Sequence, residues 1–298
     1  MTNATEPPLI SGLAELAPLY RFLLCDVWGV VHNGISAHRP AVAALARFRA
    51  EGGRVVLITN APRPKSEVVA QLDRLGAARA AYDEVVTSGE AARDYLAARP
   101  GSRIFHLGPP RDLPLYHGLP VTLTGEADAE LVSCTGLFDD ETETPDDYAG
   151  RLAGWRERGL PMLCVNPDKV VERGDRLVWC AGAIAERYAA IGGETIVVGK
   201  PHAPIYATAF ARMAAIAGGP VPKSAVLAIG DAIETDLRGA CDAGLDVLFV
   251  TGGIHAALFG ARERPELASV HAVVRDNRLA ARAILPRLVW DHADLDLL

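Results

Sequence analysis

The sequence reads LLCDVWGVV from Leu23 to Val31, and this stretch sets the interpretation of the whole chain. A continuous apolar run of strand length is typical of a parallel strand that is buried on both faces. Asp26 places a carboxylate toward the carboxyl end of this strand, where open α/β sheets bind their ligands. The structural alternative is an aspartate that only caps a loop.

Strand-length apolar runs alternate with helix-length amphipathic runs along the rest of the chain. This alternation is the βαβ pattern of a largely parallel sheet with helices on both faces, so we expect an α/β fold. Further strands are expected at 55–59, 84–87, 103–107, 130–135, 161–165, 195–198, 225–229 and 247–250. Helices are expected at 40–51, 65–75, 90–98, 145–158, 204–217 and 235–243.

Length and composition narrow the class of protein. With 298 residues the chain exceeds the usual size of one hydrophobic core, which favours two domains. The net charge of -7 and the lack of a Lys/Arg block argue against nucleic-acid binding. No basic, apolar leader and no apolar run of about 18 residues is present, so neither a targeting segment nor membrane association is expected. Scattered cysteines without CxxC pairs favour a reducing, cytoplasmic location: Cys25, Cys134, Cys164, Cys180 and Cys241.

A second carboxylate follows a later expected strand in the same way. Asp231 ends the run Ala225–Asp231, and Asp236 lies at the start of the next expected helix. Carboxylates gathered at one sheet edge suit Mg²⁺, which takes one or two of them and keeps positions for water and phosphate. Asp236 has the alternative of a helix-start residue favoured by the helix dipole.

Two further strand ends carry groups that suit phosphate. Thr59 and Asn60 follow one strand with a hydroxyl and an amide, and Lys200 follows another with a cation. Neither residue alone is strong evidence for phosphate binding, because a threonine at a strand end often serves packing and a lysine in a loop is usually solvated.

The four segments together, in this order, resemble the motifs of the haloacid dehalogenase (HAD) superfamily: Asp26, Thr59, Lys200 and Gly230-Asp231 with Asp236. The long insertion between the second and third motifs is similar to the α/β cap of its class IIA, NagD-like subfamily. This resemblance implies a Rossmann-like, doubly wound core at 1–83 and 191–298 and an inserted cap of the C2 type at 84–190. It also implies a homodimer as one option, because related proteins often dimerise through the cap.

The resemblance implies roles for these residues. Asp26 would be the nucleophile, with Thr59 and Lys200 holding the phosphoryl oxygens. Mg²⁺ would be held by Asp26, the carbonyl of residue 28 and Asp231, with Asp236 as a further candidate. Asn166 and Asp168, in an Asn-Pro-Asp segment of the cap, become candidate substrate-binding residues together with Asn60. The alternative for Asn166 and Asp168 is that they are only the polar residues that flank a proline turn.

The family pattern is broken at Trp28. HAD phosphatases carry a second aspartate there, which acts as general acid and then as general base, whereas an indole has no acid/base function. The backbone carbonyl of Trp28 keeps its place as a metal ligand. His32 is the candidate to replace this aspartate as acid/base and a further candidate substrate-binding residue, because it is the titratable residue of this loop with a suitable unperturbed pKa, near 6.5. The alternative is a loop histidine that points to solvent or is hydrogen-bonded to the backbone.

The sequence therefore predicts a Mg²⁺-dependent phosphatase that acts on a small phosphorylated metabolite, such as a nucleotide or sugar phosphate, through an aspartyl-phosphate at Asp26. Two alternatives follow from Trp28. One is a phosphometabolite-binding protein with little turnover, and the other is a slow phosphotransferase that uses an acceptor other than water.

Overall fold

The computed structural model describes residues 6–293 and divides the chain into two compact units. The first unit comprises Met1–Ile58, Val69–Val86 and Tyr206–Leu298, and the second comprises Thr59–Val68 and Thr87–Ile205. The predicted division into a core and an inserted cap stays a prediction. Its boundaries differ from those of the units, which place 59–68 and 191–205 in the second unit and 84–86 in the first.

The first unit is built on a six-stranded sheet in the order β15-β12-β11-β1-β2-β3. Its pairs β1–β2, β1–β11, β11–β12 and β12–β15 are parallel. All five residues of β1 are buried, as a parallel strand covered on both faces requires. The strands are β1 (Phe22–Asp26), β2 (Arg54–Thr59), β3 (Glu84–Thr87), β11 (Val226–Gly230), β12 (Asp246–Val250) and β15 (Ala283–Leu285).

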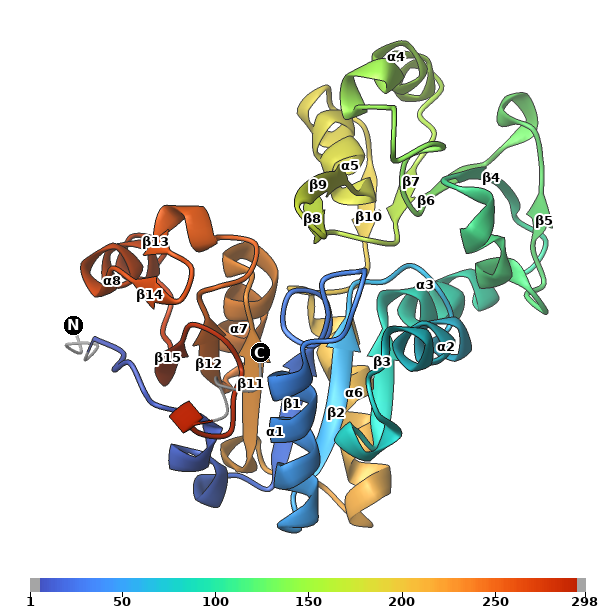
Figure 1. The fold of residues 1–298 in the computed structure, drawn as a ribbon. Coiled ribbons are helices and arrows are strands. Elements are labelled where there is room, and N and C mark those ends of the chain that lie inside the picture. Colours follow the sequence, from blue (N-terminus) through green and yellow to red (C-terminus); the bar gives the residue numbers. More distant parts are fainter. Residues whose placement is uncertain (1–5, 294–298) are drawn as a thin grey trace. The chain divides into compact units, whose positions relative to one another are not determined.

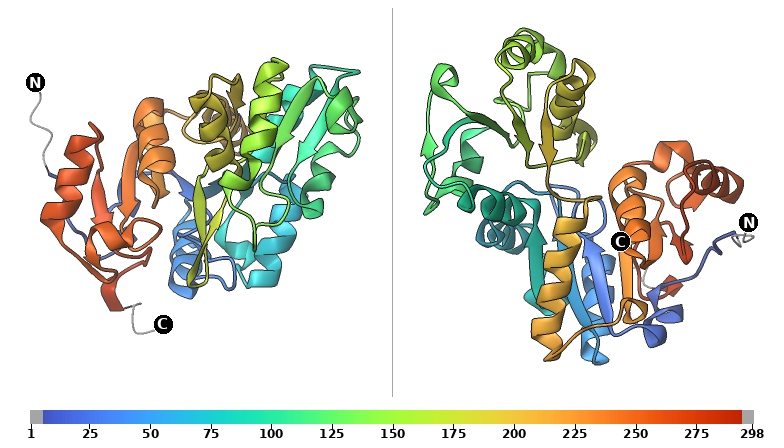
Figure 2. Two further views of the ribbon diagram at one scale, coloured as in Figure 1. Left: turned by 90° about the horizontal axis from the view of Figure 1, so that it is seen from above. Right: turned by 180° about the vertical axis from the view of Figure 1, so that it is seen from behind.

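Helices cover both faces of this sheet, with α1 on one face and α6 on the other (Figures 1 and 2). The first unit thus has the predicted α/β, doubly wound architecture, which confirms the fold class. None of the helices formed by residues 6–293 is long and apolar enough to cross a membrane. The helices wholly within this unit are α1 (Arg39–Ala50), α7 (Arg238–Ala243) and α8 (Leu267–Asp276). The first residues of α2 (Lys65–Leu75) and α6 (Ala203–Ala217) belong to the second unit and the rest to the first.

The second unit has a parallel sheet of its own, in the order β10-β7-β6-β4-β5. An antiparallel hairpin, β8 with β9, lies outside this sheet. The strands are β4 (Arg103–Leu107), β5 (Thr122–Leu123), β6 (Leu131–Cys134), β7 (Met162–Cys164), β8 (Val170–Arg173), β9 (Arg176–Trp179) and β10 (Thr195–Val197). Its helices are α3 (Ser88–Ala97), α4 (Ala149–Glu157) and α5 (Ala181–Ala190).

Alternating side chains give this second sheet two apolar faces. Met162 packs in a cluster with Trp155 of α4 and Tyr188 of α5. The next residue, Leu163, packs in a different cluster with Leu96 of α3. Successive strand residues point to opposite faces, so β7 contributes to a core on each side of its sheet.

The structure corrects several predicted elements. The strand expected at 23–31 ends at Asp26, because the chain turns back on itself: Val31 N donates to Val27 O (2.8 Å). The helix expected at 145–158 is a 3-10 turn, Pro145–Tyr148, followed by α4. Elements that were not expected are β5, β8, β9, β15, α5, α8 and the short pair β13 (Gly260–Ala261) and β14 (Arg264–Pro265).

Candidate functional site

The strand order places two predicted site residues at the point where the first sheet changes direction. The chain continues from β1 to β2 and β3 on one side, and later from β11 to β12 on the other. The gap between β1 and β11 is therefore the topological switch point, where α/β sheets bind ligands at the carboxyl ends of the strands. Asp26 ends β1, and Asp231 directly follows β11.

Three buried carboxylates gather at this switch point. One carboxylate oxygen from each of Asp26, Asp231 and Asp236 lies within 4.8 Å of the other two. In the part of the chain that the structure describes, no other group of three histidine, cysteine, aspartate or glutamate side chains meets this spacing. The predicted clustering of these aspartates is thus present, with oxygen donors of the kind that Mg²⁺ prefers.

Close backbone approach fixes the carboxylate of Asp231. Ile254 N donates to its Oδ2 (2.8 Å). A Cβ at Gly253 would lie 1.9 Å from this Oδ2, and a Cβ at Gly29 would lie 2.2 Å from it. Gly29 also has a φ of 88°, which favours glycine. The sequence did not indicate these neighbours, although the glycine pair Gly252-Gly253, one residue after a strand, was an available signal.

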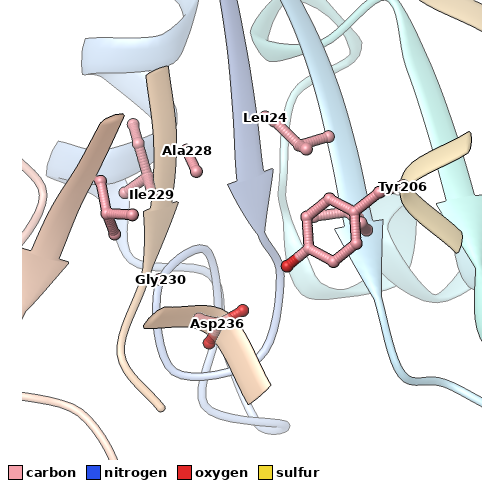
Figure 3. Close-up of a pocket in the computed structure, with 8 residues that line it drawn as sticks. Leu24, Tyr206, Ala228, Ile229, Gly230 and Asp236 are labelled. Atoms are coloured by element: carbon pink, nitrogen blue, oxygen red, sulfur yellow. The ribbon is translucent and has the colours of Figure 1, made fainter. Parts of the chain in front are cut away.

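Asp236 lies both near the start of a helical segment and in the acidic group, and its part in metal binding stays a prediction. It lies in the single turn Ile233–Leu237, and its Oδ2 accepts from Ala232 N (3.1 Å), so it caps this turn as well as joining the acidic group. A cavity of about 10 Å³ lies beside it, with Tyr206 among its lining residues (Figure 3). This volume holds about one water molecule and no substrate.

The loop after β1 places Trp28 against His32. Their rings meet edge to face, with centroids 4.9 Å apart, and His32 is buried. Gly34 N donates to Nδ1 of His32 (3.0 Å), so in the neutral ring the hydrogen lies on Nε2. The loop itself is closed by Gly29 N, which donates to His32 O (2.8 Å).

The remaining predicted residues lie in the second unit. Asn60 Oδ1 accepts from Lys200 N (2.7 Å), and Asn60 Nδ2 donates to Asp168 Oδ1 (2.9 Å). Asn166 Oδ1 accepts from Asp168 N (3.1 Å), as in a local Asx turn. Thr59 ends β2, and its Oγ1 accepts from Ala61 N (3.2 Å).

The predicted site residues thus form two groups. The first unit holds the three carboxylates with Trp28 and His32, and the second unit holds Thr59, Asn60, Asn166, Asp168 and Lys200. Convergence of these groups around one substrate, and the individual roles, stay predictions.

Comparison with known proteins identifies the family. A family model described as haloacid dehalogenase-like hydrolase matches residues 23–119, and one described as HAD-hydrolase-like matches 197–276. A crystal structure of a haloacid dehalogenase-like hydrolase from Brucella suis 1330 is similar with a TM-score of 0.85 and 49% identity, covering 94% of this chain and 100% of that one.

Two comparisons involve Mycobacterium tuberculosis. A D-glycerol 3-phosphate phosphatase from this organism is 29% identical over 92% of this chain and 76% of its own length. A crystal structure of a glycerol phosphate phosphatase in complex with magnesium is 27% identical with a TM-score of 0.61, covering 88% of this chain and 79% of that one. The resemblance predicted from the four motifs is thus confirmed, and the chain belongs to the haloacid dehalogenase-like hydrolase family.

Proposed function

We propose that this protein is a Mg²⁺-dependent phosphatase that hydrolyses a small phosphorylated metabolite through an aspartyl-phosphate at Asp26. The observation that carries this proposal is the group of three buried carboxylates, Asp26, Asp231 and Asp236, at the switch point of the sheet. The magnesium-containing phosphatase relative and the glycerol 3-phosphate phosphatase relative support both the metal and the substrate class.

Asp26 and Asp231, with Asp236 and the carbonyl of Trp28 as further ligands, would hold the metal. Three carboxylates at this spacing repel one another unless a cation or protons neutralise them, and their oxygen chemistry suits Mg²⁺. When bound, the metal would supply positive charge that offsets the charge of a phosphoryl group.

The chemistry follows from the position of the nucleophile. One Oδ of Asp26 attacks phosphorus, the bond from phosphorus to the ester oxygen breaks, and the leaving oxygen takes a proton from water. A second water then attacks phosphorus, which breaks the Asp26 oxygen–phosphorus bond and releases inorganic phosphate. Thr59 and Lys200 are proposed to hold the phosphoryl oxygens in both steps, which is the electrostatic stabilisation on which phosphoryl transfer depends.

The deciding experiment measures hydrolysis of p-nitrophenyl phosphate and of glycerol 3-phosphate with Mg²⁺ and with EDTA. Asp26→Asn keeps the shape of the side chain but removes the nucleophile, so activity should fall by at least roughly 10³-fold. Asp73→Asn changes an exposed carboxylate of the same unit and is the matched control. Wild-type turnover in a folded Asp26→Asn variant, or turnover that EDTA does not reduce, would disprove the mechanism.

Trp28 favours a second candidate, a slow phosphotransferase. An indole stands where the family has its acid/base aspartate, and it packs on His32. Without a base for water the aspartyl-phosphate would be long-lived, and an acceptor alcohol could then take the phosphoryl group from Asp26. Release of p-nitrophenol that rises with the concentration of added glycerol, together with formation of glycerol phosphate, would support this candidate.

A further inference from the structure

The side-chain amide of Asn60 makes three hydrogen bonds to the protein. Its Oδ1 accepts from Lys200 N (2.7 Å), while Nδ2 donates to Lys200 O (3.3 Å) and to Asp168 Oδ1 (2.9 Å). A carboxamide has two N–H hydrogens, and both are directed at protein oxygens here. Asn60 is also 99% buried, and its two bonds to Lys200 are buried, whereas its bond to Asp168 is partly buried.

These bonds fix the backbone of Lys200. One amide binds both the N–H and the C=O of this residue, which sets the point from which the lysine side chain extends. The preceding Gly199 has a φ of 99°, and a Cβ there would lie 2.7 Å from Asn60 Oδ1 and 2.6 Å from Ser88 Oγ. Glycine at this position therefore permits the close approach between the Lys200 segment and Asn60.

Asp168 stabilises the orientation of the Asn60 amide in which both backbone groups of Lys200 are bound. An ionised carboxylate only accepts hydrogen bonds, so it requires Nδ2 on its own side and leaves Oδ1 facing Lys200 N. A rotated amide would place its NH₂ group against the N–H of Lys200. Asp168 is itself anchored, because its N–H donates to Asn166 Oδ1 (3.1 Å) and its C=O accepts from Gly182 N (3.1 Å).

We propose that Asn60 and Asp168 are positioning residues for Lys200: Asp168 orients the amide of Asn60, and Asn60 holds the backbone of Lys200 in place. This inference rests on the proposed phosphatase function, in which Lys200 holds the phosphoryl group. It changes the predicted role of both residues, because they act on the substrate through Lys200 and not by contact.

The test is a double-mutant cycle of Asn60→Ala and Asp168→Ala, with kcat and KM measured on p-nitrophenyl phosphate. A displaced lysine loses transition-state contacts, so Asn60→Ala should lower kcat by roughly 10- to 100-fold. Because Asp168 acts through Asn60, Asp168→Ala should lower kcat in the wild-type background and have no further effect in Asn60→Ala. Asp168→Asn retains an oxygen acceptor and should recover most of the activity that Asp168→Ala loses.

Direct substrate contact by Asp168 gives a different result. The two losses would then multiply in the double variant, and Asp168→Ala would raise KM by a factor that depends on the leaving group. Asp146→Ala is the matched control, since it removes an exposed carboxylate of the same unit whose bond goes to Arg187. Circular dichroism checks folding, and if Asn60→Ala does not fold, Asn60→Asp replaces it, since it keeps the shape and loses the amide hydrogens.

A second measurement separates this inference from the proposed function. If the wild-type protein shows no turnover, the phosphatase proposal fails, and the same cycle is repeated with inorganic phosphate binding measured by calorimetry. If phosphate binding is weakened by the same factor in Asn60→Ala and in the double variant, Asp168 acts on Lys200 through Asn60. Independent, multiplying losses in either measurement would overturn it.

Discussion

At the scale of single residues, Trp28 makes the sharpest prediction about the chemistry. Trp28→Asp leaves the backbone carbonyl in place and adds the acid/base group that the family pattern contains. A positioned acid/base contributes roughly 10²–10⁴-fold to rate, so hydrolysis of esters with poor leaving groups should increase, and p-nitrophenyl phosphate should gain less. Burst kinetics would separate formation of the aspartyl-phosphate from its breakdown.

The opposing role for Trp28 is closure of the site or stacking on a substrate ring. The edge-to-face contact with His32 holds the indole in a defined position, which is compatible with either role. A folded Trp28→Asp variant that binds its substrate and is no faster on any ester would show that the missing acid/base does not limit turnover.

The buried imidazole of His106, in β4, should make the free energy of unfolding depend on pH. Burial lowers its pKa to about 4, and its Nε2 lies 3.0 Å from Thr135 Oγ1. The unfolded chain takes up this proton near pH 6.5 and the folded chain only near 4, so stability should fall as pH decreases between these values. The loss should be on the order of 2 kcal/mol, allowing for partial exposure. Urea unfolding at pH 7 and pH 5 measures it, and an equally steep loss in His106→Gln would refute the assignment.

At the scale of elements, Thr87 joins a helix to a loop of the second unit. Its Oγ1 accepts from Glu90 N (3.0 Å) at the N-terminus of α3, and its hydroxyl donates to Arg63 O (2.9 Å). Thr87→Ala removes a buried cap and should lower the free energy of unfolding by about 1–2 kcal/mol. Thr87→Ser keeps the hydroxyl, so urea unfolding should show that it retains most of the free energy of unfolding that Thr87→Ala loses. If Thr87→Ser is as unstable as Thr87→Ala, the methyl group is the stabilising part of Thr87.

The elements also show where sequence patterns stop being informative. Strands such as β1, β2 and β11 were predicted because their apolar runs are long enough to be buried on both faces. The helix α5 was not, because it follows Cys180 without a capping side chain and has Gly182 in its first turn, so no helix-start signal marks it in the sequence. Its burial depends on partners such as Trp155 of α4. The chain reversal after Asp26 was also hidden, since Val27, Val30 and Val31 are apolar enough to continue a strand.

At the scale of the whole molecule, Mg²⁺ should act as a stabilising ligand. A ligand that binds only the folded state stabilises it by about 2.7 kcal/mol at a concentration of 100 Kd. Mg²⁺ should therefore raise the melting temperature of the wild-type protein. Asp231→Asn removes one charge from the acidic group and should reduce this gain, measured at constant ionic strength with NaCl as the reference salt. If Mg²⁺ raises the melting temperature of Asp231→Asn as much as that of the wild-type protein, Asp231 is not a metal ligand.

The sequence by itself determined the α/β class and the strand-end positions of Asp26, Thr59 and Asp231, because hydrophobic periodicity and strand length are local properties. It also contained the motif order that identified the family. Only the tertiary structure decided that Asp236 joins Asp26 and Asp231, that Gly253 makes room for this group, and that the amide of Asn60 is bound by Lys200 and Asp168. These contacts join residues far apart in the chain, and the strand order and the close approach of backbones create them.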